Sequence, residues 1–419
     1  MIDLKLIESK PEEVKKLLKK KGIEEPPIDR ILELNDKRKN LIREVDNLRH
    51  LQNVTSKEIQ KDPKDRDVLI SKMREIVPKL KALEEELSTT EDALRNLILS
   101  LPNLPHESVP EGRDESENIV IRYWGEIPRF DFVPKDHMDL GESLDIIDIK
   151  RAAKISGARF YYLKREAVIL EYALVQFVTR FLMENGFVPI LPPVLAREEV
   201  LYQLGYLPEL EDQMYKVSLD DLRLVGTSEH TVIPIFKDEI LDMKDLPQRF
   251  VSFSSCFRRE AGAAGKDTRG ILRVHQFDKL EMLSFSHPEK SWEEHEFLLS
   301  LEEEIMCKLK IPYRVVLICA GDLGFPASKK YDMEAWMPGQ NKYRETHSCS
   351  NCTDFQARRL NIRYRDENRN LDYVHTLNGT ALAIGRALIA IIENNQNKDG
   401  SIRVPDVLMP YTNFEVIKR

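Results

Sequence analysis

The 419-residue sequence lacks the features of a membrane or secreted protein. It has no run of about 18 apolar residues, the length that a transmembrane helix needs. The first twenty residues carry six lysines and no apolar stretch typical of a signal peptide. Five cysteines are too few for a disulfide framework in a chain of this length. We therefore expect a cytoplasmic protein with no membrane partner.

Two common nucleotide-binding motifs are also missing. The sequence contains neither GxGxxG nor GxxxxGK[ST], which disfavours a Rossmann or P-loop site. It has one CxxC pair, Cys349-Ser-Asn-Cys352, without a second pair or two histidines at zinc-finger spacing. A zinc site and a thioredoxin-like motif remain open at this pair, but two thiols in a packed turn are the favoured interpretation.

Charge argues against a protein that is basic throughout. The chain has 63 Lys and Arg against 71 Asp and Glu, a net charge of −8. Residues 1–100 hold 22 basic and 21 acidic residues, so this part is nearly neutral. Any contact with nucleic acid must therefore come from local patches. Lys57, Lys61, Lys64 and Arg66 alternate with aspartates, including Asp62, so a phosphate-binding patch and a solvated face both stay open.

Two long helical patterns dominate the first hundred residues. Ser9-Lys10-Pro11-Glu12 predicts a capping box for a short helix that Gly22 ends. Apolar residues then recur at multiples of three and four over 34–59, and a heptad pattern runs over 73–101 with Pro78 expected to kink it. The short polar connection between the two patterns requires antiparallel packing. Limbs of about 35 residues would extend about 50 Å.

A proline-rich stretch over 102–110 indicates a boundary. We expect two domains, 1–110 and 111–419. Beyond the boundary the patterns predict a helix over 163–185, strands over 249–260, 271–286, 312–320 and 372–378, and a helix over 381–394. Because the strands are not linked by regular helical crossovers, we predict an α+β fold with a mainly antiparallel sheet.

The residues with the most chemical information flank a glycine-rich basic loop. Alternation along a strand predicts that Arg258 and Glu260 share one face, and that Arg273, Phe277 and Glu281 share a face of the partner strand. Guanidinium groups bind phosphate, an aromatic ring stacks on a base, and a carboxylate accepts from an amine. Such a set suits a nucleotide bound on a sheet. Alternating charges on a solvated strand are the alternative.

These residues resemble a known family. Phe257-Arg258-x-Glu260 and Arg273-Val-His-Gln-Phe277 are similar to the second motif of class II aminoacyl-tRNA synthetases, in the form found in seryl-tRNA synthetases. Pro192-Pro193 stands where the first motif carries its dimer-interface proline, and the segment from Asn378 to Arg386 matches the third motif. The family also begins with a long helical arm. The resemblance implies a class II synthetase fold for 111–419 and a tRNA-binding arm in 1–110.

The resemblance also implies the site residues. Serine would be bound by Thr227, Ser228, Glu229, Glu281 and Thr380, and alternation predicts that Thr227 and Glu229 share a strand face. ATP would be bound by Arg258, Arg259, Glu260, Arg273, Val274, Phe277, Glu345, Thr346, His347, Ser348 and Arg386. Arg258 and Arg386 would be catalytic, while Glu345 and Ser348 would hold Mg2+. His347 departs from the common family residue and is expected to point away from the metal.

The implied activity is that of a serine–tRNA ligase. The enzyme would activate L-serine with ATP and transfer the seryl group to the 3′ end of tRNA(Ser), with tRNA(Sec) left open as a second acceptor. Lys266 and Arg269 would touch pyrophosphate or the acceptor end. We expect a homodimer on the same resemblance. Two alternatives stay open: a relative that charges a carrier protein, and a catalytically silent coiled-coil paralogue.

Overall fold

The computed structural model describes residues 1–61, 64–262, 265, 267 and 269–419. The chain forms two compact units, Met1–Leu104 and Pro105–Arg419. The functional assignment of 1–110 and 111–419 as separate domains stays a prediction. The expectations for Asp62 and Lys266 fall outside the described residues.

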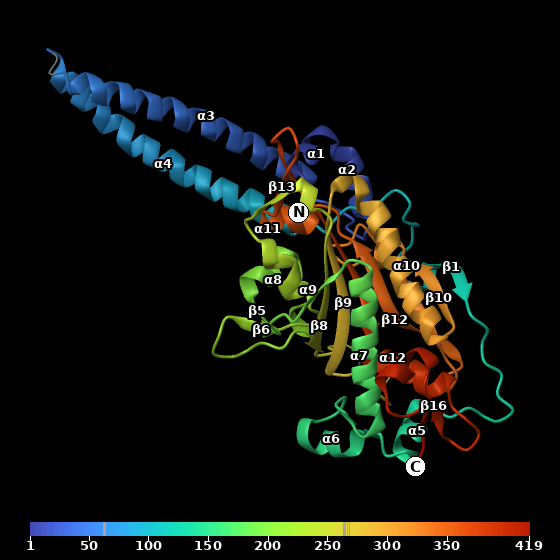
Figure 1. Ribbon diagram of the computed structural model, residues 1–419. Coiled ribbons are helices and arrows are strands. Elements are labelled where there is room, and N and C mark those ends of the chain that lie inside the picture. Colours follow the sequence, from blue (N-terminus) through green and yellow to red (C-terminus); the bar gives the residue numbers. More distant parts are fainter. Residues whose placement is uncertain (62–63, 263–264, 266, 268) are drawn as a thin grey trace. The chain divides into compact units, whose positions relative to one another are not determined.

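A helical hairpin makes up most of the N-terminal unit. The helices are α1 (Leu4–Ser9), α2 (Pro11–Lys20), α3 (Ile28–Ile59) and α4 (Arg66–Leu99). Figure 1 shows α3 and α4 side by side, and ion pairs of 2.7 Å between Lys37 and Glu86 and of 2.8 Å between Arg49 and Glu84 join them. The predicted antiparallel hairpin is confirmed. The helix α4 continues through Pro78 without a break.

A small apolar core joins α1 and α2 to the base of the hairpin. Its fully buried members include Ile7, Val14, Leu18 and Ile31. The predicted capping box is wrong, because Ser9 is the last residue of α1 and its hydroxyl donates to the Lys5 carbonyl at 2.8 Å. The helix α2 begins at Pro11 without a side-chain cap. Proline is favourable at this position because the first helical N–H has no partner within the helix.

An eight-stranded sheet forms the centre of the C-terminal unit. In spatial order its strands are β1 (Ile119–Trp124), β10 (Tyr313–Leu317), β11 (Lys329–Met337), β12 (Lys342–Asn351), β15 (His375–Ala383), β9 (Gln276–Ser286), β8 (Gln248–Phe257) and β4 (Val188–Ile190). Every neighbouring pair is antiparallel except β4 with β8. The predicted fold class, α+β with a mainly antiparallel sheet, is confirmed.

The remaining strands form small ribbons around this sheet. They are β2 (Ile147–Asp148) with β3 (Tyr162–Leu163), β5 (Leu195–Arg197) with β6 (Leu222–Leu224), β7 (Ile240–Asp242) with β13 (Arg363–Arg365) and β14 (Leu371–Tyr373), and β16 (Ile402–Arg403) with β17 (Val416–Ile417). The other helices are α5 (His137–Ser143), α6 (Ile149–Ser156), α7 (Glu166–Glu184), α8 (Glu198–Leu204), α9 (Glu229–Val232), α10 (Ser291–Leu309), α11 (Phe355–Leu360) and α12 (Ile384–Asn394).

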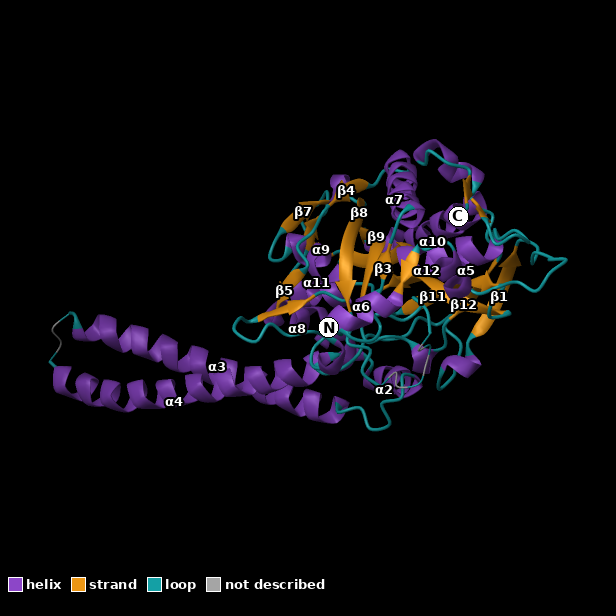
Figure 2. Ribbon diagram, turned by 90° about the horizontal axis from the view of Figure 1, so that it is seen from below, coloured by secondary structure: helices purple, strands orange, loops and turns teal. Residues whose placement is uncertain are grey.

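The main core lies between the sheet and the helices α7, α10 and α12 (Figure 2). Buried side chains from these helices, such as Leu174, Ile305 and Leu388, pack on Met282 and Leu377 of the sheet. Burial of one such side chain contributes about 1.5–3 kcal/mol. On the opposite side of β9, Phe277, Lys279 and Glu281 lie at the site described below, while Leu283 and Phe285 further along the strand belong to a second apolar core.

One polar group interrupts this core. Glu302 of α10 is fully buried, and in the described part of the chain neither of its carboxyl oxygens has a hydrogen-bond partner. Gly379 of β15 leaves room for it, since a Cβ there would lie 2.9 Å from Glu302 Oε1. Burial, together with the nearby Asp332 and Glu303, raises the pKa of Glu302 well above its ordinary value. The folded protein therefore keeps a proton on this carboxyl.

We predict that Glu302→Gln stabilises the protein, and more so as the pH rises. In the unfolded chain Glu302 loses its proton above pH 4.5, whereas the folded chain retains it. Because the unfolded state binds fewer protons there, rising pH favours unfolding of the wild type by about 1.4 kcal/mol per pH unit. Glutamine has nearly the same shape and no proton to lose.

Urea unfolding at pH 5, 6 and 7, followed by circular dichroism, measures this gain. Glu303→Gln is the matched control, because Glu303 pairs with Arg122 and its amide should not stabilise the fold. Equal stability of wild type and Glu302→Gln at all three pH values would contradict a buried, protonated Glu302.

Candidate active site

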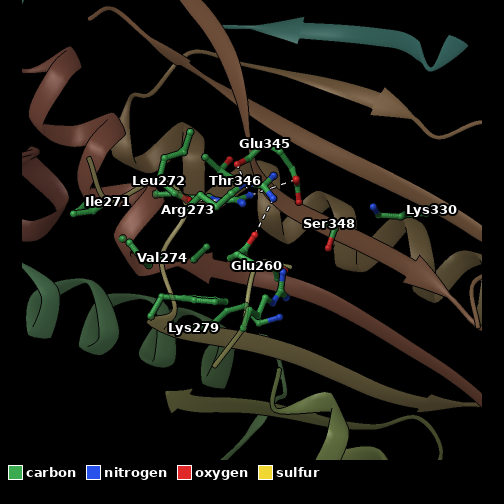
Figure 3. A pocket seen from close by; sticks show the side chains of 16 residues that line it. Glu260, Ile271, Leu272, Arg273, Val274, Lys279, Lys330, Glu345, Thr346 and Ser348 are labelled. Carbon is green, nitrogen blue, oxygen red and sulfur yellow. Dashed lines mark hydrogen bonds and ion pairs between the residues drawn. The ribbon is translucent and has the colours of Figure 1, made fainter. Parts of the chain in front are cut away.

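Most of the predicted site residues surround adjoining cavities in the C-terminal unit. The first, here called the central cavity, has a volume of about 250 Å³ (Figure 3). The lining residues that the sequence predicted are Arg258, Glu260, Arg273, Val274, Phe277, Glu345, Thr346, Ser348, Thr380 and Arg386. Arg258 also lines two neighbouring cavities, of about 500 Å³ and about 360 Å³. The structure therefore brings these residues together around one connected space.

The reason for this grouping differs from the predicted one. The strand β8 ends at Phe257 and β9 begins at Gln276, so Arg258, Glu260 and Arg273 lie outside both strands. Alternation of faces applies to regular strands, so only the prediction that Phe277 and Glu281 share a face survives. Glu260 has a φ of 52°, which turns the chain back at this point. The Arg273 Nη1 atom then donates to Glu260 Oε2 at 2.8 Å, and Figure 3 shows the two side chains facing each other.

Arg258 is held at the junction of the cavities. Its Nε donates to the Gly226 carbonyl at 3.1 Å, and its guanidinium carbon lies 5.3 Å from the centre of the Phe277 ring. A cation over an aromatic face gains about 0.5–1 kcal/mol where exposed and more where water is excluded. These contacts fix the cation against the ring that the sequence predicted would stack on a base.

Arg386 and Glu345 form a second charged pair at the cavity. The Arg386 Nη1 atom lies 3.4 Å from Glu345 Oε2 and donates to the Glu345 carbonyl at 2.8 Å. The surrounding protein opposes ionisation of Glu345, but the charges of Arg386, Lys330 and Arg258 outweigh it and lower the pKa of this carboxyl to about 2. Glu345 is therefore an anion at neutral pH, within a field of three cations.

The cavity of about 360 Å³, here called the side cavity, is lined by Thr227, Glu229, Lys279 and Glu281. The Thr227 hydroxyl donates to Glu281 Oε2 at 3.0 Å. The ammonium of Lys279 pairs with the same Glu281 oxygen and donates to Thr227 Oγ1 at 2.9 Å. Burial lowers the pKa of Lys279 to about 8. A carboxylate, a hydroxyl and an ammonium therefore meet at one wall of the side cavity.

The predicted shared strand face of Thr227 and Glu229 is wrong. Thr227 lies in a bend and Glu229 is the first residue of α9, where the two-residue alternation of a strand does not apply. The two side chains have different partners: Thr227 bonds Glu281, whereas Glu229 Oε1 accepts from the Gln356 amide at 2.8 Å. Both nevertheless line the side cavity.

Three predicted residues do not line these cavities: Ser228, Arg259 and His347. Ser228 is fully buried and its hydroxyl bonds that of Ser252. His347 is buried and its Nδ1 lies 2.8 Å from Thr346 Oγ1. Arg269, at the end of the loop, pairs with Asp136 at 3.0 Å and Asp139 at 2.5 Å rather than facing a cavity.

Sequence reasoning missed three residues of the site. Lys279 and Lys330 line both the central and the side cavity, and Gln356 orients Glu229. The position of Lys279 two residues before Glu281 in β9 was a usable signal, since strand residues two apart share a face. Lys330 and Gln356 come from distant segments, and nothing local in the sequence places them here.

The cysteine pair is packed where β12 ends and the chain turns. Cys349 and Cys352 are buried and joined by no disulfide, as are Cys256 and Cys319, while Cys307 is half-buried. Within the ranges that the structure describes, no group of three or more His, Cys, Asp or Glu side chains could hold a metal ion. In the same ranges, every helix is too short or too polar to cross a bilayer.

Comparisons with known proteins agree with this architecture. Residues 1–105 match the seryl-tRNA synthetase N-terminal domain, and residues 215–395 match the tRNA synthetase class II core domain (G, H, P, S and T). The serine–tRNA ligase of Rubrobacter xylanophilus is 48% identical over 100% of this chain and 99% of its own. That of Pyrococcus horikoshii is 47% identical over 100% of this chain and 97% of its own.

Solved structures show the same similarity. The seryl-tRNA synthetase of Pyrococcus horikoshii complexed with ATP superposes with a TM-score of 0.94 at 47% identity, over 100% of this chain and 99% of that one. The cytoplasmic serine–tRNA ligase of Naegleria fowleri in complex with AMP gives 0.90 at 32% identity over the same shares. This chain belongs to the seryl-tRNA synthetase family.

This chain is therefore a serine–tRNA ligase, and its substrates are serine, ATP and tRNA. The predicted family, reaction and enzyme class are confirmed. The comparisons do not support the two alternatives, which were a relative that charges a carrier protein and a catalytically silent paralogue.

Proposed function

We propose that the central cavity binds ATP and the side cavity binds serine, with Arg258 between them. One observation carries this proposal: Arg258 lines both cavities while its guanidinium packs over Phe277. Seryl-adenylate forms when the serine carboxylate attacks the α-phosphorus, so negative charge develops where the two substrates meet. A cation held at that point stabilises this charge without having to move.

The other ATP residues have complementary roles in this proposal. Phe277 stacks on adenine, and Glu260 with the Val274 backbone contacts the base edge. Arg386 neutralises the γ-phosphate end from the wall of the central cavity, beside Glu345. The chain needs no nucleophilic side chain for this step, because in-line attack by serine depends on positioning and electrostatic stabilisation.

Serine selection is proposed to depend on Glu281, Thr380, Thr227 and Glu229. Thr380 of β15 lines the central cavity and Glu281 of β9 lines the side cavity, but the two are direct neighbours in the antiparallel ladder, so both can reach one hydroxyl group where the cavities adjoin. Glu281 is only 2% exposed. A substrate without the hydroxyl, such as alanine, would lose the hydrogen bonds that this buried polar wall offers to serine, which discriminates strongly. The buried Ser228 supports the turn through Ser252.

We further propose that Glu345 and Ser348 hold Mg2+. Both are oxygen donors that line the central cavity, and Glu345 is ionised at neutral pH. One or two protein ligands suit Mg2+, which completes its octahedral shell with water and substrate phosphates. The ion would supply positive charge to the phosphate oxygens of bound ATP. Thr346 and His347 between them pack into the sheet, where the Thr346 hydroxyl donates to the Met333 carbonyl at 3.2 Å.

A homodimer is proposed from the exposed apolar residues of α7 and β4. Tyr172, Val188 and Leu191 are 58%, 57% and 80% exposed. They precede Pro192-Pro193, which stands where the first motif carries its dimer-interface proline. Sedimentation should therefore give twice the chain mass of 48.7 kDa, and a monomer mass at micromolar concentration would contradict the proposal. The five cysteines form no disulfide among the described residues, which supports work in a reducing compartment, for which we propose the cytoplasm.

The predicted N-terminal domain, residues 1–110, is proposed to bind tRNA(Ser). The long, largely polar hairpin supplies none of the residues assigned to adenylate formation, but it offers an extended surface to a large substrate. Whether tRNA(Sec) is also charged is decided by the same contacts.

Arg258→Ala tests the assignment of the two cavities. We predict a loss of about 100-fold or more in serine-dependent ATP–pyrophosphate exchange, the usual cost of removing one group that stabilises developing charge. The circular dichroism spectrum should stay unchanged. Arg122→Ala is the control, since it removes an arginine of β1 that pairs with Glu303 of α10 and lines none of the three cavities. Near-normal exchange by Arg258→Ala would refute the assignment.

Shortening the hairpin tests the role of the arm. Replacement of residues 42–87 by a short Gly-Ser turn keeps Ile31, Leu34, Leu94 and Ile98, which form the core at the hairpin base. We predict unchanged ATP–pyrophosphate exchange and a loss of tRNA aminoacylation, because only the second reaction needs the arm. Normal aminoacylation by the shortened enzyme would show that the hairpin does not bind tRNA.

A further inference from the structure

A short irregular segment, Ile271–Val274, lines the central cavity just before β9 begins. Three consecutive residues of this segment each form a hydrogen bond with a different part of the chain. The Leu272 carbonyl accepts from Arg386 Nε at 3.4 Å, and Arg273 donates to Glu260 at 2.8 Å. The backbone N–H of Ile271 donates to His137 Nε2 at 3.2 Å. Arg386 and Glu260 belong to the proposed ATP site, whereas His137 does not.

His137 is itself fixed by a buried carboxylate. It is the first residue of α5 and only 3% exposed. Its ring Nδ1 lies 2.8 Å from Glu393 Oε1, which also accepts from the His137 backbone N–H at 3.1 Å. The other oxygen of Glu393 accepts from the Gly339 N–H at 2.8 Å. Because the Ile271 N–H donates to Nε2, these partners place the ring proton on Nδ1.

Two glycines allow this close approach. Gly270 has a φ of 92°, and a Cβ there would lie 2.2 Å from His137 Nε2. A Cβ at Gly339 would lie 2.5 Å from the Asp136 Cα. Any larger residue at either position would push the imidazole or its backbone away. The geometry around His137 is thus set from both sides, by α12 and by the end of the glycine-rich loop.

We propose that His137 is a positioning residue of the seryl-tRNA synthetase reaction. Its Nε2 holds Ile271 and thereby sets the backbone of Leu272–Val274 against ATP. His137 does not line the described cavities, so it acts on the nucleotide only through Ile271. This inference rests on the proposed ATP role of the central cavity. It concerns nucleotide affinity and leaves serine binding untouched.

A pair of substitutions separates positioning from simple stability. In His137→Asn the amide takes the place of Nδ1 and keeps the bond to Glu393, but it is too short to reach Ile271. In His137→Gln the amide oxygen takes the place of Nε2 and accepts from Ile271. We expect His137→Asn to raise the KM for ATP in pyrophosphate exchange by about 3- to 10-fold, the effect of one lost hydrogen bond. The KM for serine should stay unchanged, and His137→Gln should restore the KM for ATP.

Controls make each outcome decisive. His375→Gln removes the contact of a half-buried histidine, 2.7 Å from its Nδ1 to the Ser291 hydroxyl, and should leave both KM values unchanged. The melting temperature of every variant is measured in parallel. A wild-type KM for ATP in His137→Asn overturns the inference. A second outcome also overturns the inference. In it, the KM for ATP and the KM for serine both rise in His137→Asn and in His137→Gln, in proportion to the fall in melting temperature.

The test also distinguishes failure of the inference from failure of the proposed function. If Arg258→Ala loses exchange while His137→Asn keeps a normal KM for ATP, only the inference about His137 is wrong. If Arg258→Ala keeps normal exchange, the ATP assignment of the central cavity is wrong, and the inference falls with it.

Discussion

The antiparallel pairing of β8 with β9 is the constraint on which the site depends. Its ladder runs from Gln248 opposite Phe285 to Phe257 opposite Gln276. The pairing places Phe277, Lys279 and Glu281 of β9 along one face, and it ends where the chain leaves the sheet at Arg258 and enters it after Arg273. The irregular ends of the two strands then meet through the Arg273–Glu260 ion pair. A shift of this register by one residue would turn Lys279 and Glu281 away from the cavities.

Charge balance around the cavities follows from that geometry. Arg258, Arg273, Arg386, Lys279 and Lys330 bring five cations to the walls, and the carboxylates of Glu260, Glu281 and Glu345 lie among them. Each carboxylate has a cation beside it, so the pairs remain stable before substrate arrives. The substrates carry their own anionic groups, the phosphates of ATP and the carboxylate of serine. When a substrate binds, its anionic groups can replace a wall carboxylate beside a wall cation. Because that cation is already held in the protein, little further hydration is lost.

Two buried carboxyl groups near the site differ in how their burial is accommodated, one by hydrogen bonds and the other by protonation. Glu393 uses both oxygens, in bonds to His137 and Gly339, and it fixes the segment that carries Ile271. Glu302 has no partner among the described residues and stays protonated beneath Gly379. The first group supports the proposed nucleotide site from behind. The second stabilises nothing that the structure shows, and its burial lowers stability at neutral pH.

The sequence by itself determined the helical hairpin, the strands β8, β9, β10 and β15, the helices α7 and α12, and the residue types of the site, but it did not indicate β11, β12 or α10. Heptad spacing and face alternation are local properties, so they can be read without a fold, and the motif residues identified the family. Only tertiary structure decided how the site is assembled. Glu260 reaches Arg273 through a backbone turn rather than a shared strand face, and Lys330, Gln356 and His137 come from segments far apart in the chain. Contacts of that kind depend on sheet register and helix packing, which no local pattern encodes.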